Sequence, residues 1–345
     1  MPVFDIGDVL ENLSNRFQGL SPQRYSFLSS LCAATTLHLN FEGTETSSKR
    51  LEDALWARNQ YDTIGDRSLD TLLSSFFLSI AYWCLDREKY AGFYLQETIA
   101  LALARNMHRE DHYQDLSVAD SEYHRRIFWT LFTTERTFCL IYDKPMILRP
   151  WIRKPQNRIP GERYLIDGFV QVLGMIENLS IEQTTWTASG CVTPLSLKES
   201  LGENISNIWE SESICPIQKF EALITGQWLQ AKLWKLIAKP SPTPFYAAKD
   251  ARQRPHPLVI GRAVLHILET FKPISRGCHG IALDRKLYDI CECLCDVAPE
   301  LQQFGTEFKE LGRVVSGLLR VLSEFKGCTP HVLSNIQKLA QKLFL

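Results

Sequence analysis

The sequence has no surplus of charge of either sign. Lysine and arginine number 38, aspartate and glutamate number 39, and the net charge is −1 over 345 residues. Free-standing nucleic-acid-binding domains usually carry a basic surplus. The balance therefore argues against a chain whose whole surface binds nucleic acid, although it leaves room for a local basic patch.

A secretion signal and a membrane-length apolar run are missing as well. The first residues, MPVFDIGDVLENL, are acidic and have no basic region ahead of an apolar stretch. The apolar run at 71–85 lies between Asp70 and Asp86, and it falls short of the roughly 20 residues that cross a bilayer. We therefore expect a buried core helix there and no membrane contact. We also expect a reducing compartment, in which the ten cysteines stay free thiols.

The common enzyme signatures are absent from the sequence. It contains no Gly-x-Gly-x-x-Gly, no Walker A loop, no Gly-x-Ser-x-Gly elbow and no Asp-Asp-x-x-Asp. We therefore name no catalytic residue and expect no enzyme. An all-helical enzyme or small-molecule binder stays open as an alternative.

Two short patterns have the residue types of a metal site. Cys291, Cys293 and Cys295 form Cys-x-Cys-x-Cys, but on a helix Cys293 points away from the other two. His108 and His112 are four residues apart, yet the Glu of His-Glu-x-x-His is missing. We expect buried thiols at the first pattern, a solvated or capping role at the second, and no cofactor or metal at either.

Apolar residues recur at helical spacing along most of the chain, and period-two alternation is hard to find. The predicted fold class is all-α, as a single large helical domain. Helices are expected at 21–39, 49–60, 69–85, 88–107, 120–142, 162–179, 218–238, 256–271, 283–297, 300–325 and 330–343. Stretches rich in proline, serine or threonine are expected to be irregular, namely 143–161, 180–217 and 239–257.

Residues 121–150, SEYHRRIFWTLFTTERTFCLIYDKPMILRP, place charges on the apolar face of an expected helix. Glu135 lies four residues after Leu131, and Arg136 lies four after Phe132, so both fall in the packed stripe. Buried charges are costly unless they are paired. We therefore expect an ion-pair network that draws on nearby arginines: Arg105, Arg125 and Arg126.

The same stretch carries an ordered set of short motifs: Arg-Arg-x-Phe-Trp, Glu-Arg, Lys-Pro and Leu-Arg-Pro. Upstream, residues 69–109 contain Tyr94-Leu95, an Ala-Leu-Ala-Leu run and His108-Arg109. Together these resemble the middle homology region of fungal zinc-cluster transcription factors, in particular the sugar-utilisation activators. The family-motif positions are Arg125, Arg126, Phe128, Trp129, Glu135, Arg136, Lys144, Pro145 and Leu148.

For these positions the resemblance implies a structural role, as a charge network inside a helical core. It also suggests a division of the chain into three parts. These are an N-terminal helical segment at 1–68, the regulatory core at 69–160 and a C-terminal helical region at 161–345.

The resemblance implies a nuclear regulator of transcription that controls carbohydrate-use or biosynthetic-cluster genes. Full-length members of that family read DNA through an N-terminal cluster of six cysteines that binds zinc. The first 70 residues here hold one cysteine, Cys32, and no basic cluster. We therefore expect no bound zinc, a transcription-factor partner or a homodimer, and DNA contact through a partner. A shortened gene model that lacks the zinc module is the other explanation. One alternative is a co-regulator that dimerises with a full-length relative and never contacts DNA.

Two further expectations concern ligands. A small-molecule effector would bind between helices 69–85 and 120–142, where charges are buried among aromatic side chains. The densest basic run would serve as a nuclear import signal or as a surface for an acidic partner, although its wide spacing favours a solvated loop. That run consists of Lys144, Arg149, Arg153, Lys154, Arg158 and Arg163.

Overall fold

The computed structural model confirms the all-α class. It describes residues 3–14, 17–38, 44–156, 167–185, 194–238, 257–272, 280–323, 334, 337–338 and 340–341. Within these ranges the regular structure is helical and no strand is formed. Contacts group the chain into two compact units, Met1–Ile166 and Asp167–Leu345. The first unit thus takes in both the expected N-terminal segment and the expected regulatory core.

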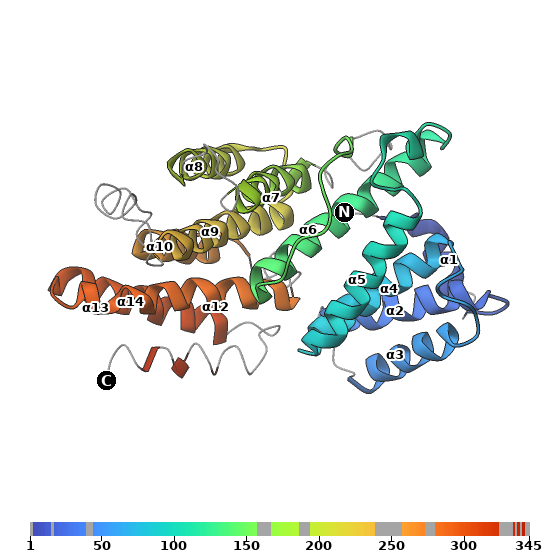
Figure 1. The fold of residues 1–345 in the computed structure, drawn as a ribbon. Helices are drawn as coiled ribbons and strands as arrows, with labels where there is room; N and C mark the ends of the chain where they lie inside the picture. Colours follow the sequence, from blue (N-terminus) through green and yellow to red (C-terminus); the bar gives the residue numbers. More distant parts are fainter. Residues whose placement is uncertain are drawn as a thin grey trace. The chain divides into compact units, whose positions relative to one another are not determined.

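The first unit is built from helices that pack along the order of the chain (Figure 1). Helix α2 packs against α3 and α4, α4 packs against α5, and α5 packs against α6. Its elements are α1 (Ile6–Ser14), α2 (Pro22–His38), α3 (Thr44–Arg58), α4 (Leu69–Cys84), α5 (Glu88–Ala104), the 3₁₀ turn η1 (Glu110–Tyr113) and α6 (Val118–Tyr142).

Helix α4 is the apolar run that the sequence places in the core. Ser68 caps its start by accepting a hydrogen bond from the amide of Thr71 at 3.2 Å, and Asp70 lies in the first turn, where a negative charge is favourable. Leu72, Leu73 and Leu78 are buried, which confirms the prediction of a core helix. In the described part of the chain, no helix has the length and apolar character that a membrane span requires.

Small side chains let α2, α3 and α4 approach closely. Ala33, Ala54 and Ala81 meet in one buried cluster. Beside it, the Ser26 hydroxyl donates to the carbonyl oxygen of Ala54 at 3.0 Å and lies 2.6 Å from the Ser74 hydroxyl. The hydroxyls of Ser26 and Ser74 therefore both have a partner, which offsets the cost of burying them.

The second unit is arranged around α9, which contacts α7, α8, α10 and α12. Gly226 of α9 faces Ile205 of α8 so closely that an added Cβ would lie 2.6 Å from that side chain. The helices therefore meet at a position where only glycine fits without a shift. The elements are α7 (Asp167–Thr185), α8 (Pro194–Glu210), α9 (Pro216–Ala238), α10 (Pro257–Thr270), α12 (Gly280–Asp296), α13 (Ala298–Leu301) and α14 (Gly305–Ser323).

A ladder of polar side chains joins α9 to α12. Lys286 donates to Glu221 at 2.5 Å, and the indole N–H of Trp228 donates to Asp289 at 2.7 Å. Lys235 pairs with Glu292. Residues further along α9 pair with residues further along α12, so the two helices run in the same direction.

Most expected helices appear near their expected positions, with three corrections. Helix α8 lies inside 180–217, which was expected to be irregular; its buried Leu201 and Ile208 keep helical spacing among the polar residues. The helix expected at 300–325 is divided into α13 and α14, and α1 was not foreseen. The stretch 239–256 lies outside the described residues, as does most of 330–343.

Candidate functional site

Helix α6 buries an unusual number of charged side chains. Glu122, Arg125, Arg126, Glu135 and Arg136 are all buried along it. Glu135 and Arg136 thus lie on the packed face of the helix, as their spacing in the sequence indicated. Isolated buried charges are costly, so each of these side chains needs partner groups. The partners show which part of the chain the helix binds.

Glu135 and Arg136 bind the chain just after α6. The two side chains form an ion pair at 2.6 Å. Glu135 accepts hydrogen bonds from the amides of Ile147 at 2.5 Å and Leu148 at 3.1 Å, and Arg136 donates to the carbonyl oxygen of Leu148. Burial raises the pKa of Glu135, and the Arg136 guanidinium and the two amides oppose that rise.

The same arrangement continues toward the start of α6. The indole N–H of Trp129 donates to the carbonyl oxygen of Arg153 at 2.9 Å, and Glu122 accepts from the amide of Gln156 at 2.9 Å. Trp129 and Glu122 lie seven and fourteen residues before Arg136, on one face of the helix. Residues 144–156, which we call the return segment, therefore run back along α6 in the opposite direction.

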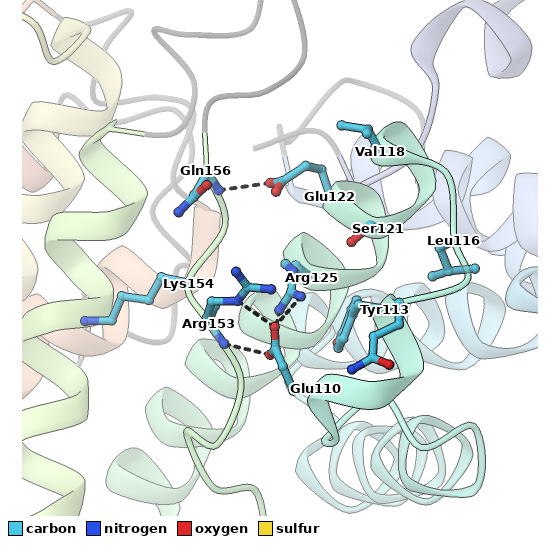
Figure 2. Close-up of a pocket in the computed structure, with 11 residues that line it drawn as sticks. Glu110, Tyr113, Leu116, Val118, Ser121, Glu122, Arg125, Arg153, Lys154 and Gln156 are labelled. Carbon is cyan, nitrogen blue, oxygen red and sulfur yellow. Dashed lines mark hydrogen bonds and ion pairs between the residues drawn. The ribbon is translucent and has the colours of Figure 1, made fainter.

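Glu110 of η1 anchors the far end of the return segment (Figure 2). It accepts two hydrogen bonds from the Arg125 guanidinium, at 2.5 and 2.9 Å, and it accepts from the Nε of Arg153 at 2.7 Å and from its amide at 3.1 Å. The bonds from Arg125 are the main cause that lowers the pKa of Glu110 to about 2. Glu110 thus stays ionised across the physiological range.

Aromatic rings complete the surroundings of two of the arginines. The guanidinium carbon of Arg125 lies 3.9 Å from the centroid of the Tyr113 ring, and that of Arg136 lies 4.3 Å from the Phe132 ring. A cation over a ring face is attracted by about 0.5–2 kcal/mol, more when water is excluded. These contacts help to offset the cost of burying the guanidinium groups.

The partners within the network differ from those expected. The ion-pair partner of Glu135 is its neighbour Arg136, and Arg125 pairs with Glu110. Glu135 and Arg125 are ten residues apart along the helix, too far for their side chains to meet. Arg105, the alternative partner, has a buried Nε that finds no hydrogen-bond partner in the described part of the chain.

The remaining family-motif positions fall into two groups. Phe128, Trp129 and Leu148 are buried in the core. Lys144 and Pro145 lie at the surface, where Lys144 pairs with Glu88 at 3.3 Å. The carbonyl oxygen of Pro145 nevertheless accepts a hydrogen bond from the thiol of Cys139 at 3.3 Å. The family-motif positions therefore lie partly on α6 and partly in the return segment that α6 binds.

Between 69–85 and 120–142, where an effector pocket was expected, the described residues leave one small cavity. The cavity lined by Leu72, Phe76, Ile127 and Leu131 has a volume of about 10 Å³, which is room for about one water molecule. Aromatic and aliphatic side chains fill the space instead. A larger hollow of about 180 Å³ lies at the start of α6, beside Glu110, Ser121 and Arg153 (Figure 2).

The two short metal-like patterns take other roles. The Nε2 atom of His112 lies 3.0 Å from Nδ1 of His124, and the rings of these two residues stack with centroids 5.2 Å apart. The partner of His112 is therefore His124 and not His108. Burial lowers the pKa of His124 to about 4, so both rings are neutral near pH 7. Cys291 and Cys293 are buried on α12, and burial raises the pKa of the Cys293 thiol to about 12.

Sequence reasoning missed Glu110 and Glu122, the two carboxylates that hold Arg153 and Gln156. Glu122 did carry a signal, because it falls seven residues before Trp129 on the charged face of α6. Glu110 carried none, since its partners lie 15 and 43 residues away.

Comparison with known proteins finds a family whose domain resembles the first unit. Residues 1–154 match the fungal specific transcription factor domain, which spans α1 to α6 and nearly all of the return segment. The matched family is one of transcription factors and not of enzymes. No solved structure matches the chain at a significant level.

Three relatives illustrate the likeness. A probable sucrose utilization protein of Candida albicans is 27% identical over 268 residues, covering 69% of this chain and 50% of the relative. A respiratory transcription factor of Saccharomyces cerevisiae is 20% identical over 318 residues, covering 88% and 67%. A maltose fermentation regulatory protein of the same yeast is 23% identical over 297 residues, covering 79% and 60%. This chain thus spans between half and two thirds of their lengths, and its residues 1–154 are similar to the fungal specific transcription factor domain.

Proposed function

We propose that this chain regulates transcription in the nucleus, and that its target genes serve carbohydrate use or a biosynthetic gene cluster. The observation that carries the proposal is the match of residues 1–154 to the fungal specific transcription factor domain. The matched range coincides with the compact first unit, Met1–Ile166. Relatives named for sucrose utilization and maltose fermentation support the choice of sugar-related genes.

We further propose that the chain binds a transcription-factor partner or a second copy of itself, and that it reaches DNA through a partner, without zinc of its own. The buried thiols of α12 support the second part, because zinc binds the thiolate form and burial opposes ionisation of Cys293. Elemental analysis of the purified protein tests that part: stoichiometric zinc would contradict it.

A small-molecule effector, in this proposal, binds the hollow of about 180 Å³ beside Glu110. The charges that line it are largely paired with one another, as Glu110 is with Arg125 and Arg153. A neutral, polar molecule suits such a lining better than an ion, since an ion would have to compete with those pairs. The volume lies below the roughly 300–1,000 Å³ of drug-sized pockets, so the molecule would be small.

The experiment that tests the function is chromatin occupancy of the protein, tagged at its own locus, in cells grown on glucose, sucrose or maltose. Discrete promoter peaks, with altered transcripts of the bound genes when the gene is deleted, are the expected result. Altered transcripts without peaks would favour the co-regulator that never contacts DNA. Neither peaks nor altered transcripts under any of these conditions would contradict the proposal.

A further inference from the structure

The return segment presents two different faces. Its buried side consists of Leu148, Ile152 and Pro155, which pack beneath it. Its outward side carries Ile147, Arg149, Trp151 and Arg153, all exposed. Trp151 is 70% exposed and Ile147 is 47% exposed. We call these four outward side chains the ridge.

The ridge is fixed in place by bonds to its main chain. The amides of Ile147, Leu148, Arg153 and Gln156 all donate to buried or half-buried carboxylates, and the carbonyl oxygens of Leu148 and Arg153 accept from Arg136 and Trp129. At the centre, the amide of Trp151 donates to the carbonyl oxygen of Arg149 at 2.9 Å and closes a tight turn. An otherwise irregular stretch therefore displays an exposed tryptophan from a rigid base.

This arrangement argues against a nuclear import signal in residues 144–156. A basic peptide that is read in an extended form uses its own main chain for recognition, as in the addition of a strand to a sheet edge. Here the amides of Ile147, Leu148, Arg153 and Gln156 are already bonded to α6 and η1, and the side chains of the ridge face outward. The segment can thus offer a surface but not a free strand.

The side chains of the ridge indicate which kind of partner surface it would bind. Tryptophan and arginine are the residues most enriched among those that dominate binding energy in protein interfaces. Arg149 and Arg153 flank Trp151, so a matching surface needs bulky apolar groups set among carboxylates. Duplex DNA fits poorly, because a protein that binds through its phosphates typically makes about 6–10 basic contacts. Two of the basic groups nearby, Lys144 and Arg153, are already paired with Glu88 and Glu110.

We propose that the ridge is a docking surface for an acidic protein segment that carries bulky apolar side chains among its carboxylates. Trp151 inserts between apolar groups of that segment, and the Arg149 guanidinium group binds its carboxylates. The proposal deepens the proposed function by naming a class of partner. It is tested in purified components, so its failure leaves the transcriptional role standing.

The test measures fluorescence anisotropy of a labelled synthetic peptide, in which Glu and Asp alternate with Leu and Phe, titrated with the purified 345-residue protein. Trp151→Ala is expected to weaken binding by tenfold or more, and Arg149→Glu by a comparable factor that shrinks as salt is raised. Trp56→Ala is the matched control, because Trp56 is 62% exposed on α3, away from the ridge. It should leave the affinity unchanged.

Both ridge variants alter outward side chains and keep the main-chain bonds, so their melting temperatures should equal that of the wild type. A peptide with Lys in place of Glu and Asp should not bind. The proposal is overturned if the wild type does not bind the acidic peptide, or if Trp56→Ala weakens binding as much as Trp151→Ala. It is also overturned if a labelled DNA duplex displaces the peptide and binds more tightly. Self-association that Trp151→Ala abolishes would show that a second copy occupies the ridge, and it too would overturn the proposal.

Discussion

Glu135 and Arg136 are adjacent in the sequence, and their side chains hold the same residue from two sides. Glu135 accepts from the amide of Leu148 at 3.1 Å, and Arg136 donates to its carbonyl oxygen. The two side chains close the arrangement with an ion pair at 2.6 Å, and both are about 1% exposed. A helix and the segment that follows it are thereby joined through a buried pair of charges.

The first prediction concerns that pair. Arg136→Met removes the cation and leaves the Glu135 carboxylate buried, so the free energy of unfolding should fall by about 3–5 kcal/mol. Urea unfolding followed by circular dichroism measures the loss. Arg320→Met is the control: the pair between Arg320 and Glu269 is at the surface, and its loss should cost less than about 1 kcal/mol. Equal effects of the two substitutions would show that the buried pair has no special role.

A double variant refines this prediction. Glu135→Leu combined with Arg136→Met removes both charges together, so no uncompensated ion remains in the core. Replacing a buried pair by apolar groups is often neutral or stabilising by about 1–4 kcal/mol. The double variant should therefore be more stable than Arg136→Met alone, although it also loses the bonds to Leu148.

The second prediction concerns Trp129. Trp129→Phe keeps the aromatic core but deletes the hydrogen bond to the carbonyl oxygen of Arg153, at a cost of about 1–3 kcal/mol. Trypsin should then cleave after Arg153 faster than in the wild type. Trp83→Phe is the matched control, because the buried indole N–H of Trp83 has no hydrogen-bond partner among the described residues. Faster cleavage in both variants would mean that the Trp129 bond does not hold the segment.

The third prediction is a dependence on acid. The pKa of Glu110 is lowered to about 2, from an ordinary value of 4.5, chiefly by the bonds from Arg125. A lowered carboxyl pKa stabilises the fold fully above the unfolded value, and this contribution is lost as the pH falls from 4.5 toward 2. Because Glu110 is partly exposed, solvent screening keeps the effect near about 1 kcal/mol. The wild type should exceed Glu110→Gln in stability at neutral pH and lose that advantage near pH 2, as measured by urea unfolding.

The fourth prediction concerns the ladder between α9 and α12. The Lys286 side chain is 3% exposed, whereas that of Glu221 is 29% exposed. Glu221→Leu leaves the ammonium group of Lys286 buried without its carboxylate, beside the Thr225 hydroxyl at 2.8 Å, and should cost about 3–5 kcal/mol. Lys286→Met leaves a carboxylate that water can reach, and should cost clearly less. The reverse order in thermal melting would contradict this account of the ladder.

Much of the first unit could be predicted from the sequence, because its signals are local. The apolar run at 71–85 has its cap at Ser68, and the long amphipathic α6 ends two residues before Lys144. Helical spacing and capping depend on neighbours within a few turns, so a single sequence contains them.

The path of the return segment could not be predicted in the same way. Its bonds join residues that are up to 43 positions apart, as in the contact of Arg153 with Glu110. A loop rich in proline and arginine has the composition of a solvated stretch, and only the buried carboxylates opposite reveal that its main chain is bound. The polar ladder between α9 and α12 was not predicted for a related reason: charged residues at helical spacing are typical of the exposed face of a helix.

Helix α8 shows a different limit. Serine, threonine and proline around 180–217 favoured an irregular stretch, but the buried Leu201 and Ile208 pack among the helices of the second unit. Tertiary packing overrode a weak local preference, as it commonly does. The same packing explains why Gly226 lies where α8 approaches α9.

The central claim is that α6 and η1 hold residues 144–156 in one fixed path. Hydrogen exchange of the purified protein, resolved to single amides, tests it most directly. The account predicts slow exchange at Ile147, Leu148 and Arg153, whose amides donate to Glu135 and Glu110. In Arg136→Met, exchange at Ile147 and Leu148 should accelerate while the amides of α4 stay protected. Exchange of these amides in the wild type at the rate of an unstructured peptide would contradict the claim.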